Sequence, residues 1–361
     1  MARAADAVVV FLGLPPSYES EGYDRDHIDL PPEQVELLAA VADVTADVVV
    51  VLANGSVVAV DAWIDRTAAV LEAWLGGQAG GGAVADVLLG AVNPSGRLAE
   101  TMPRRLADTP AHLNFPGEDR HVRYGEGLFV GYRHHDAVGR EVSFPFGHGL
   151  SYTTFEHADL DVRVLPAGAD RDAGWRGPDR LEVSVAVTNT GAVAGQEVVQ
   201  VYVGDPEASV TRPVRELKGF AKVRLEPGET ATATVVLAER DLSYWSTRAG
   251  GWVFEPGEFE VAVGASSRDL RQRAVVHVDG PPLALPLDRE STLAEWLEHP
   301  VGHEVVLAAL RRAPGGDLSG LVDDPERLRM LGSFPLKRLV GMLGMGEGAP
   351  VVDGLLAEVV G

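Results

Sequence analysis

Five carboxylate side chains lie within fourteen residues near the start of the chain, at positions 17–30. Glu19 and Glu21 are separated by one residue, and Asp24 and Arg25 follow directly. A carboxyl group whose pKa is raised by burial or by a neighbouring carboxylate can hold a proton near neutral pH and donate it. The stretch is therefore a candidate site for acid–base chemistry, with an ordinary solvated turn as the alternative.

The flanking elements place this stretch at one edge of a sheet. Residues 7–12 form a short, continuous, β-branched run, which predicts a central strand buried on both faces. Pro15 and Pro16 end it, because proline cannot donate to a strand ladder. Residues 33–41 predict a helix, with Pro31 just before it and acidic residues in its first turn. The loop then leaves the carboxyl end of a strand, where open α/β sheets present functional groups.

The rest of residues 1–155 also predicts an α/β domain. Residues 47–52 form a second fully buried strand, residues 57–60 are a candidate third strand, and residues 83–89 have helical spacing. The glycine-rich run at residues 76–82 matches neither dinucleotide nor P-loop spacing. We expect this run to allow close backbone approach at a domain junction rather than to bind phosphate.

Residues 156–280 predict an antiparallel β-sandwich built from a succession of short strands. Alternating apolar and polar residues, separated by turn signals, mark five strands at residues 181–187, 198–203, 231–237, 259–263 and 274–278. Residues 166–180 form a polar excursion near the start of this region. Residues 281–361 predict a helical tail, for which we expect packing or a partner contact, with helices near residues 291–298, 302–312 and 324–345.

Two aromatic stretches, residues 123–133 and 144–152, lie in the loop-rich end of the α/β region. Aromatic side chains combine flat apolar faces with polar groups. The stretches are typical either of the wall of a binding cleft or of a surface on which two domains dock, and the sequence leaves both open.

The composition excludes several classes of function. The net charge of −22 and the pI near 4.8 disfavour nucleic acid and anionic membranes as partners, although solubility alone also explains the acidity. The absence of cysteine excludes disulfides, a thiol nucleophile and a cysteine–zinc site. We find no zinc or calcium motif and predict no metal and no cofactor. Without a signal peptide or a long apolar run, the expected location is cytoplasmic.

The motifs together resemble glycoside hydrolase family 3, the β-glucosidase family. Residues 19–25, followed by residues 29–31, are similar to the acid/base loop of that family. Further similar segments follow in family order between about residues 6 and 280, at positions 74–88, 93–98, 124–132, 144–152, 215–220 and 241–245. The resemblance implies the C-terminal α/β sandwich domain of the family followed by a fibronectin type III-like domain, in agreement with the division above.

The resemblance also implies roles for individual residues. Glu21 matches the general acid/base of the family. Glu19 is the alternative acid/base, or it supplies a neighbouring charge or a hydrogen bond to the sugar; it lies on the same side as Glu21 if the segment is extended. Asp24 and Arg25 are expected to hold the loop as an ion pair. The implied substrate is a terminal β-D-glucoside or oligosaccharide, hydrolysed with retention by two carboxyl groups roughly 5–5.5 Å apart.

The sequence departs from the family at its start. In the family a (β/α)8 barrel precedes this region and carries the nucleophilic aspartate, and nothing in this sequence resembles that barrel. We expect an N-terminally truncated chain or half of a split enzyme, inactive until a barrel domain or subunit joins it. An exposed apolar strand edge near residues 7–12 would invite association, including a homo-oligomer. The alternative is a non-catalytic carbohydrate-binding or protein-interaction scaffold derived from such an enzyme.

Overall fold

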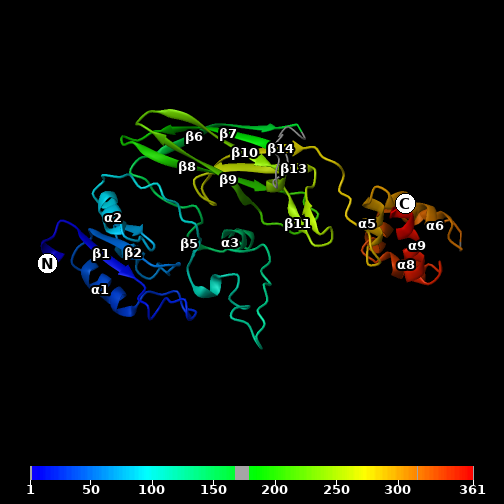
Figure 1. Ribbon diagram of the computed structural model, residues 1–361, viewed down its shortest axis with the longest axis horizontal. Helices are drawn as coiled ribbons and strands as arrows, with labels where there is room; N and C mark the ends of the chain where they lie inside the picture. The colour runs from blue at the N-terminus through cyan, green and yellow to red at the C-terminus, as the bar shows by residue number, and fades with distance from the viewer. Residues whose placement is uncertain (1, 167–178, 315, 361) are drawn as a thin grey trace. The chain divides into compact units, whose positions relative to one another are not determined.

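The computed structural model describes residues 2–166, 179–314 and 316–360 (Figure 1). It contains an α/β region, a β-sandwich and a group of C-terminal helices, which confirms the predicted fold class. The chain divides into two units, and residues 239–257 group with the C-terminal helices rather than with the sandwich. The domain boundaries after residues 155 and 280 stay predictions, and the polar excursion at 166–180 lies largely outside the described residues.

The α/β region contains a sheet of three parallel strands in the order β1-β2-β3. The strands are β1 (Val8–Gly13), β2 (Val48–Ala53) and β3 (Ala69–Glu72); α1 (Pro32–Ala42) connects β1 to β2, and α2 (Gly80–Leu88) follows β3. These elements confirm the strands predicted at 7–12 and 47–52 and both helices. The prediction of a strand at residues 57–60 is wrong, because these residues form a loop. The third strand is β3, which was not predicted from the sequence.

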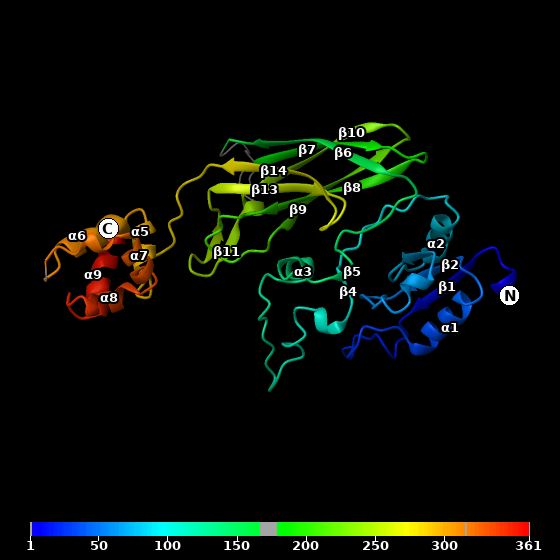
Figure 2. The same ribbon diagram turned by 180° about the vertical axis from the view of Figure 1, so that it is seen from behind.

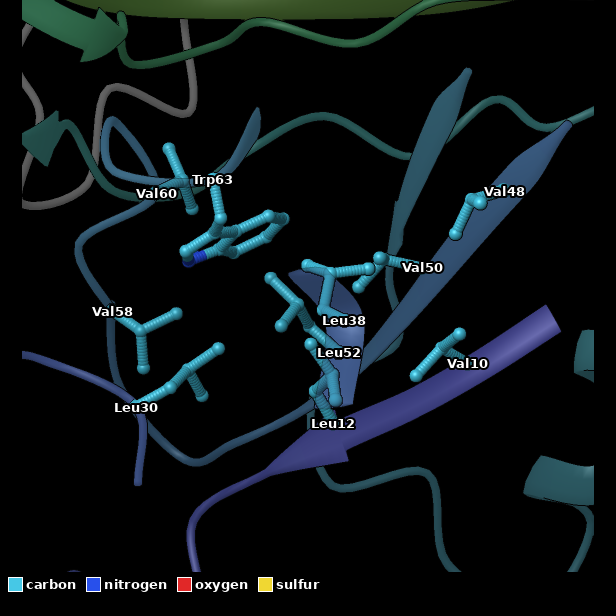
Figure 3. Packing of buried hydrophobic residues seen from close by; sticks show 10 residues of the cluster. All are labelled: Val10, Leu12, Leu30, Leu38, Val48, Val50, Leu52, Val58, Val60 and Trp63. Carbon is cyan, nitrogen blue, oxygen red and sulfur yellow. The ribbon is translucent and has the colours of Figure 1, made fainter. Parts of the chain in front are cut away.

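The core of this region lies between α1 and one face of the sheet (Figure 3). Leu38 of α1 is fully buried, and the side chains around it come from β1, β2 and the loops: Val10, Leu12, Leu30, Val48, Val50, Leu52, Val58, Val60 and Trp63. Full burial of one such aliphatic side chain contributes about 1.5–3 kcal/mol. The apolar run of β2 and the amphipathic face of α1 therefore hold together the edge from which the acidic loop leaves.

Strand β1 corrects the prediction of a central strand buried on both faces. Val10 and Leu12 are buried, but Val9 is 42% and Phe11 65% exposed. Within the described residues β1 pairs only with β2 and is an edge strand. A continuous apolar run cannot distinguish a strand covered on two faces from a strand covered on one, and only the α1 side is covered here.

The glycine-rich run also differs from its prediction. A Cβ atom added at Gly77, Gly80, Gly81 or Gly82 would meet no heavy atom within 4 Å. The last three of these glycines form the first turn of α2. The run thus begins a helix on an open surface, and the close backbone approach seen within it is local: a Cβ atom added at Gly76 would stand 3.1 Å from Cα of Gly80.

The β-sandwich consists of a three-stranded sheet, β10-β7-β6, and a four-stranded sheet, β14-β13-β8-β9 (Figure 2). The strands are β6 (Phe155–Val164), β7 (Asp179–Asn189), β8 (Gly195–Gly204), β9 (Glu216–Leu225), β10 (Thr230–Ala238), β13 (Gly257–Gly264) and β14 (Leu270–Val278). All five predicted strands are present. Strands β6 and β9 were not predicted; β6 carries a register shift between Ala158 and Asp161 that breaks its alternation.

The loop-rich segment between α2 and the sandwich contains β4 (Met102–Pro103), α3 (Tyr132–Ala137) and β5 (Val142–Phe144). Tyr132 stacks on Phe146 with ring centroids 4.7 Å apart and meets the buried Tyr202 of β8 edge-on at 6.0 Å. Gln200 of β8 donates hydrogen bonds to the carbonyls of Gly147 and Ala265 at 3.0 and 2.7 Å. For these members of the aromatic stretches the structure favours docking on the sandwich over the wall of a cleft.

The second unit contains the short helix α4, a hairpin of two strands and five C-terminal helices. Its elements are α4 (Glu239–Leu242), β11 (Tyr244–Ser246), β12 (Gly251–Val253), α5 (Leu293–Glu298), α6 (Gly302–Arg311), α7 (Pro325–Leu331), α8 (Leu336–Met342) and α9 (Gly348–Val360). Thr292 and Glu295 form a capping box at the start of α5. The helix predicted at 324–345 is divided before Pro335 into α7 and α8, and α9 was not predicted. None of the helices described is long and apolar enough to cross a membrane.

Candidate functional site

The candidate site lies at the carboxyl edge of the parallel sheet. Because β1, β2 and β3 run in the same direction, the segments that follow them emerge at one edge. These segments are the acidic loop after Gly13, the turn that begins at Asn54 and the residues after Glu72. Carboxylate side chains from the acidic loop and from the end of β3 therefore lie at this edge, beside the turn that begins at Asn54.

Glu21 lies at the tip of the acidic loop. Ser20 and Tyr23 form an antiparallel bridge, so Glu21 and Gly22 are the two central residues of a tight turn. The hydroxyl of Tyr23 donates a hydrogen bond to the carbonyl of Pro16, which closes the base of the loop. Glu21 itself is exposed and accepts no hydrogen bond from any residue that the structure describes. Its carboxyl group is thus free to meet a group from outside this region.

Glu19 is engaged differently from Glu21. One carboxylate oxygen accepts a hydrogen bond from the backbone N–H of Gly55 at 2.7 Å, and the other accepts one from the hydroxyl of Ser56 at 3.1 Å. The expectation that Glu19 and Glu21 lie on the same side required an extended segment, whereas the segment turns at Glu21. The structure therefore does not bring the two carboxylates together as a pair.

Arg25 holds the far end of the loop without Asp24. Its Nη2 donates to the hydroxyl of Ser56 at 2.8 Å and to the carbonyl of Val57 at 2.9 Å. Asp24 is exposed, and the described residues show no ion pair between it and Arg25. Sequence neighbours of opposite charge need not pair when one of them finds partners elsewhere in the fold.

Glu72, which the sequence analysis missed, ends β3 at the same edge. Its Oε1 accepts a hydrogen bond from the backbone N–H of Trp74 at 2.9 Å, and its Oε2 lies 3.4 Å from Nδ2 of the fully buried Asn54. Burial raises the pKa of Glu72 to about 7; both hydrogen bonds oppose this rise, and the nearby carboxylate of Glu100 adds to it. The sequence signal for this residue was a glutamate at the end of an apolar strand, which becomes visible once residues 69–72 are identified as that strand.

The pKa of Glu72 predicts a pH-dependent stability. A carboxyl group whose pKa is about 7 in the fold and 4.5 in the unfolded chain keeps its proton longer in the fold. Stability therefore falls as the pH rises through this range. The Glu72→Gln variant lacks this titrating group. Its free energy of unfolding, relative to that of the parent, should therefore be higher at pH 8 than at pH 5 by on the order of 2 kcal/mol, a value reduced for solvent screening. Urea denaturation at the two pH values measures it.

The exposed Glu36 of α1 offers a matched control for this measurement. Glu36→Gln makes the same chemical change in the same region, so its stability relative to the parent should stay constant between pH 5 and pH 8. A Glu72→Gln variant that follows the parent at both pH values would show that Glu72 does not keep its proton in the fold.

The site presents one exposed carboxyl group on a held loop, whereas a retaining glycosidase needs two carboxyl groups. An exposed carboxyl on a held loop can serve as a proton donor, but a second, nucleophilic carboxyl must stand roughly 5–5.5 Å away. Glu19 is not a free nucleophile, since both of its oxygens accept hydrogen bonds. Among the described residues no group of three or more His, Cys, Asp or Glu side chains could hold a metal ion.

Comparison with known proteins agrees with this fold. Residues 1–152 match the model of the glycosyl hydrolase family 3 C-terminal domain, and residues 197–267 match that of a fibronectin type III-like domain. The chain therefore carries the C-terminal domain of glycoside hydrolase family 3, followed by a fibronectin type III-like domain.

Individual relatives support the same assignment. The chain is 45% identical over 345 residues to an exo-α-(1→6)-L-arabinopyranosidase of Bifidobacterium breve, covering 96% of this chain and 44% of that protein. It is 52% identical over 278 residues to the thermostable β-glucosidase B of Acetivibrio thermocellus, covering 77% of this chain and 36% of that protein. The crystal structure of a Bifidobacterium adolescentis family 3 β-glucosidase superposes with a TM-score of 0.78 at 50% identity, over 84% of this chain and 44% of that one. The chain thus spans less than half the length of these relatives.

Proposed function

We propose that this chain supplies the acid/base domain of a retaining β-glycosidase and that Glu21 is the general acid/base. The observation that carries the proposal is the exposed carboxyl of Glu21 at the tip of a tight turn on the carboxyl edge of the sheet. A proton donor that serves a sugar bound by another domain must reach out of its own fold. It must also stay in one place, because a misplaced group loses most of the benefit of proximity.

The nucleophile has to come from a (β/α)8 barrel, as a domain or as a separate subunit. The described residues contain three short parallel strands and no eightfold alternation of strands and helices. We therefore propose that the 361 residues alone turn over no glycoside. The exposed side chains of Val9 and Phe11 on β1 mark an apolar face that such an assembly would have to accommodate.

Two substrate classes follow from the relatives. A terminal β-D-glucoside is the first candidate, because the relatives named β-glucosidases share the acid/base region. An α-L-arabinopyranoside is the second, and a specific observation favours it. The two relatives named arabinopyranosidases align over 96% and 99% of this chain, whereas the Acetivibrio enzyme aligns over 77%. A non-catalytic carbohydrate-binding or protein-interaction scaffold is the remaining alternative.

An activity assay on this chain, alone and joined to the barrel domain of a family 3 enzyme, tests the proposal. Nitrophenyl β-D-glucoside and nitrophenyl α-L-arabinopyranoside serve as substrates. We expect no release of nitrophenol from either substrate with the chain alone, and turnover of one of them by the joined protein. Turnover by the chain alone would contradict the need for a barrel, and an inactive but sugar-binding joined protein would favour the scaffold.

A further inference from the structure

The acidic loop is tied to the turn after β2 at a point just before Glu21. Both oxygens of Glu19 accept hydrogen bonds from this turn, from the backbone N–H of Gly55 at 2.7 Å and from the hydroxyl of Ser56 at 3.1 Å. Hydrogen bonds to an ionised carboxylate are shorter and stronger than those between neutral groups. The side chain of Glu19 thus ties the acidic loop to residues 55 and 56, and we call this pair of hydrogen bonds the Glu19 clasp.

The loop is tied to the same turn again just after Glu21. Nη2 of Arg25 donates to the hydroxyl of Ser56 at 2.8 Å and to the carbonyl of Val57 at 2.9 Å. The Ser56 hydroxyl therefore accepts from Arg25 while it donates to Glu19. The two ties enclose the tight turn that carries Glu21, and the Ser56 hydroxyl takes part in both of them.

The turn after β2 is itself held by polar side chains at the ends of β2 and β3. Asn54 is fully buried, and its Nδ2 donates to the carbonyl of Ser56 at 3.0 Å and lies 3.4 Å from a carboxyl oxygen of Glu72. Glu72 accepts a hydrogen bond from the backbone N–H of Trp74. A continuous set of polar contacts therefore runs from the end of β3 through the turn after β2 to the loop of Glu21.

From these contacts we infer that Glu19 is a positioning residue for Glu21, acting through the Gly55–Ser56 turn, and that it is not a sugar ligand. The inference rests on the proposed role of Glu21 as the acid/base. Each oxygen of the carboxylate already accepts a hydrogen bond from the protein, and together the two bonds hold the side chain against the turn. The same carboxylate fixes the backbone two residues before the catalytic side chain, where small displacements cost large factors in rate.

The first test measures the clasp in this full chain, independently of catalysis. In the Glu19→Gln variant one oxygen becomes an NH2 group facing the Ser56 hydroxyl, and the charge is lost. Amide hydrogen exchange at Gly55 should then become roughly 10- to 100-fold faster, the factor expected when a charged hydrogen bond is lost. Asp26→Asn is the matched control, since it removes a charge from a side chain of the same loop that is 97% exposed, and it should leave the exchange unchanged.

The second test measures turnover after the chain is joined to a barrel domain. Glu19→Gln should lower kcat roughly 10- to 100-fold with KM changed by less than about threefold, because positioning, not binding, is impaired. Ser56→Ala should act in the same direction. So should Gly55→Ala, whose added Cβ would stand 3.0–3.1 Å from the carboxylate atoms of Glu19. Asp26→Asn should match the parent in both kcat and KM.

The results separate this inference from the proposed function. Unchanged amide exchange at Gly55 in Glu19→Gln would contradict the structural role of the Glu19 hydrogen bonds. A rise in KM at constant kcat would contradict the positioning role and indicate a sugar contact instead. Faster exchange with unchanged kcat would also overturn the positioning role. Glu21→Gln, assayed beside these variants, reports on the acid/base alone: full activity there contradicts the proposed function, whereas the exchange result for Glu19 stands by itself.

Discussion

Replacing Glu21 with glutamine in the barrel-joined enzyme should lower kcat for glycosides with poor leaving groups by roughly 10²- to 10⁴-fold, the usual contribution of general acid catalysis. Glutamine fills the same space at the tip of the turn but has no proton to give. The alcohol leaving group of an alkyl glucoside must then depart as an alkoxide. The measurement is kcat on such a glucoside together with KM, which should stay within a few-fold because the sugar is bound elsewhere.

The leaving group separates acid catalysis from a general loss of structure. A dinitrophenyl glycoside needs little protonation to depart, so its cleavage step should be far less affected by Glu21→Gln. Glu33, exposed in the first turn of α1, provides a matched control, and Glu33→Gln should leave kcat on both substrates unchanged. The quantity to compare is kcat/KM, which reports on the cleavage step alone, because kcat also contains hydrolysis of the glycosyl-enzyme, in which the same residue acts as the base. An equal loss of kcat/KM on both substrates would contradict the acid/base role of Glu21 and indicate a misfolded loop.

The parts of the fold that depend on local pattern could be predicted from the sequence, and the parts that depend on long-range contacts could not. Five strands of the sandwich and α1 follow from periodicity and turn residues, whereas β6 and β9 do not. The exposed face of β1 does not, because a continuous apolar run such as residues 7–12 has the same pattern whether one face is covered or two. The helix expected at 324–345 is an exception, since Pro335 restricts its predecessor to extended conformations and is itself a local signal for the interruption.

The candidate site shows the same division at the level of single residues. The motif around Glu21 is local and identified its loop. The partners of Glu19 lie 36 and 37 residues further along the chain, so the sequence could not decide between a sugar ligand, a catalytic carboxylate and a structural one. Glu72 was missed for a related reason: its position at the carboxyl edge becomes visible only when β3 is recognised as a third parallel strand.

A buried ion pair in the sandwich supports the second large prediction. Nη2 of Arg97, in the loop after α2, lies 2.9 Å from a carboxylate oxygen of Glu197 on β8, with side-chain exposures of 8% and 2%. The other oxygen of Glu197 lies 3.6 Å from Nε2 of His157 on β6, whose side chain is fully buried. One arginine therefore neutralises a carboxylate that has almost no access to water, and it joins the α/β region to the sandwich in doing so.

Arg97→Ala should destabilise the sandwich by about 3–5 kcal/mol, the usual cost of leaving one partner of a buried ion pair without its counterion. Glu197 would then lie in the interior without its counterion, which costs free energy. The urea midpoint of the transition that removes the β-sheet circular dichroism signal measures this loss. The Arg224–Glu226 pair, 71% and 62% exposed, is the matched control, and Arg224→Ala should leave the midpoint unchanged.

The double variant Arg97→Met, Glu197→Gln decides whether the unpaired charge is the cause. With no carboxylate left in the interior, most of the loss caused by Arg97→Ala should be recovered, since replacing both partners removes the desolvation penalty together with the attraction. A double variant that is as unstable as the sum of its single changes would contradict this account. In that case the arginine would act through the packing of its aliphatic stem against Gly149, whose added Cβ would stand 3.0 Å from its Cδ.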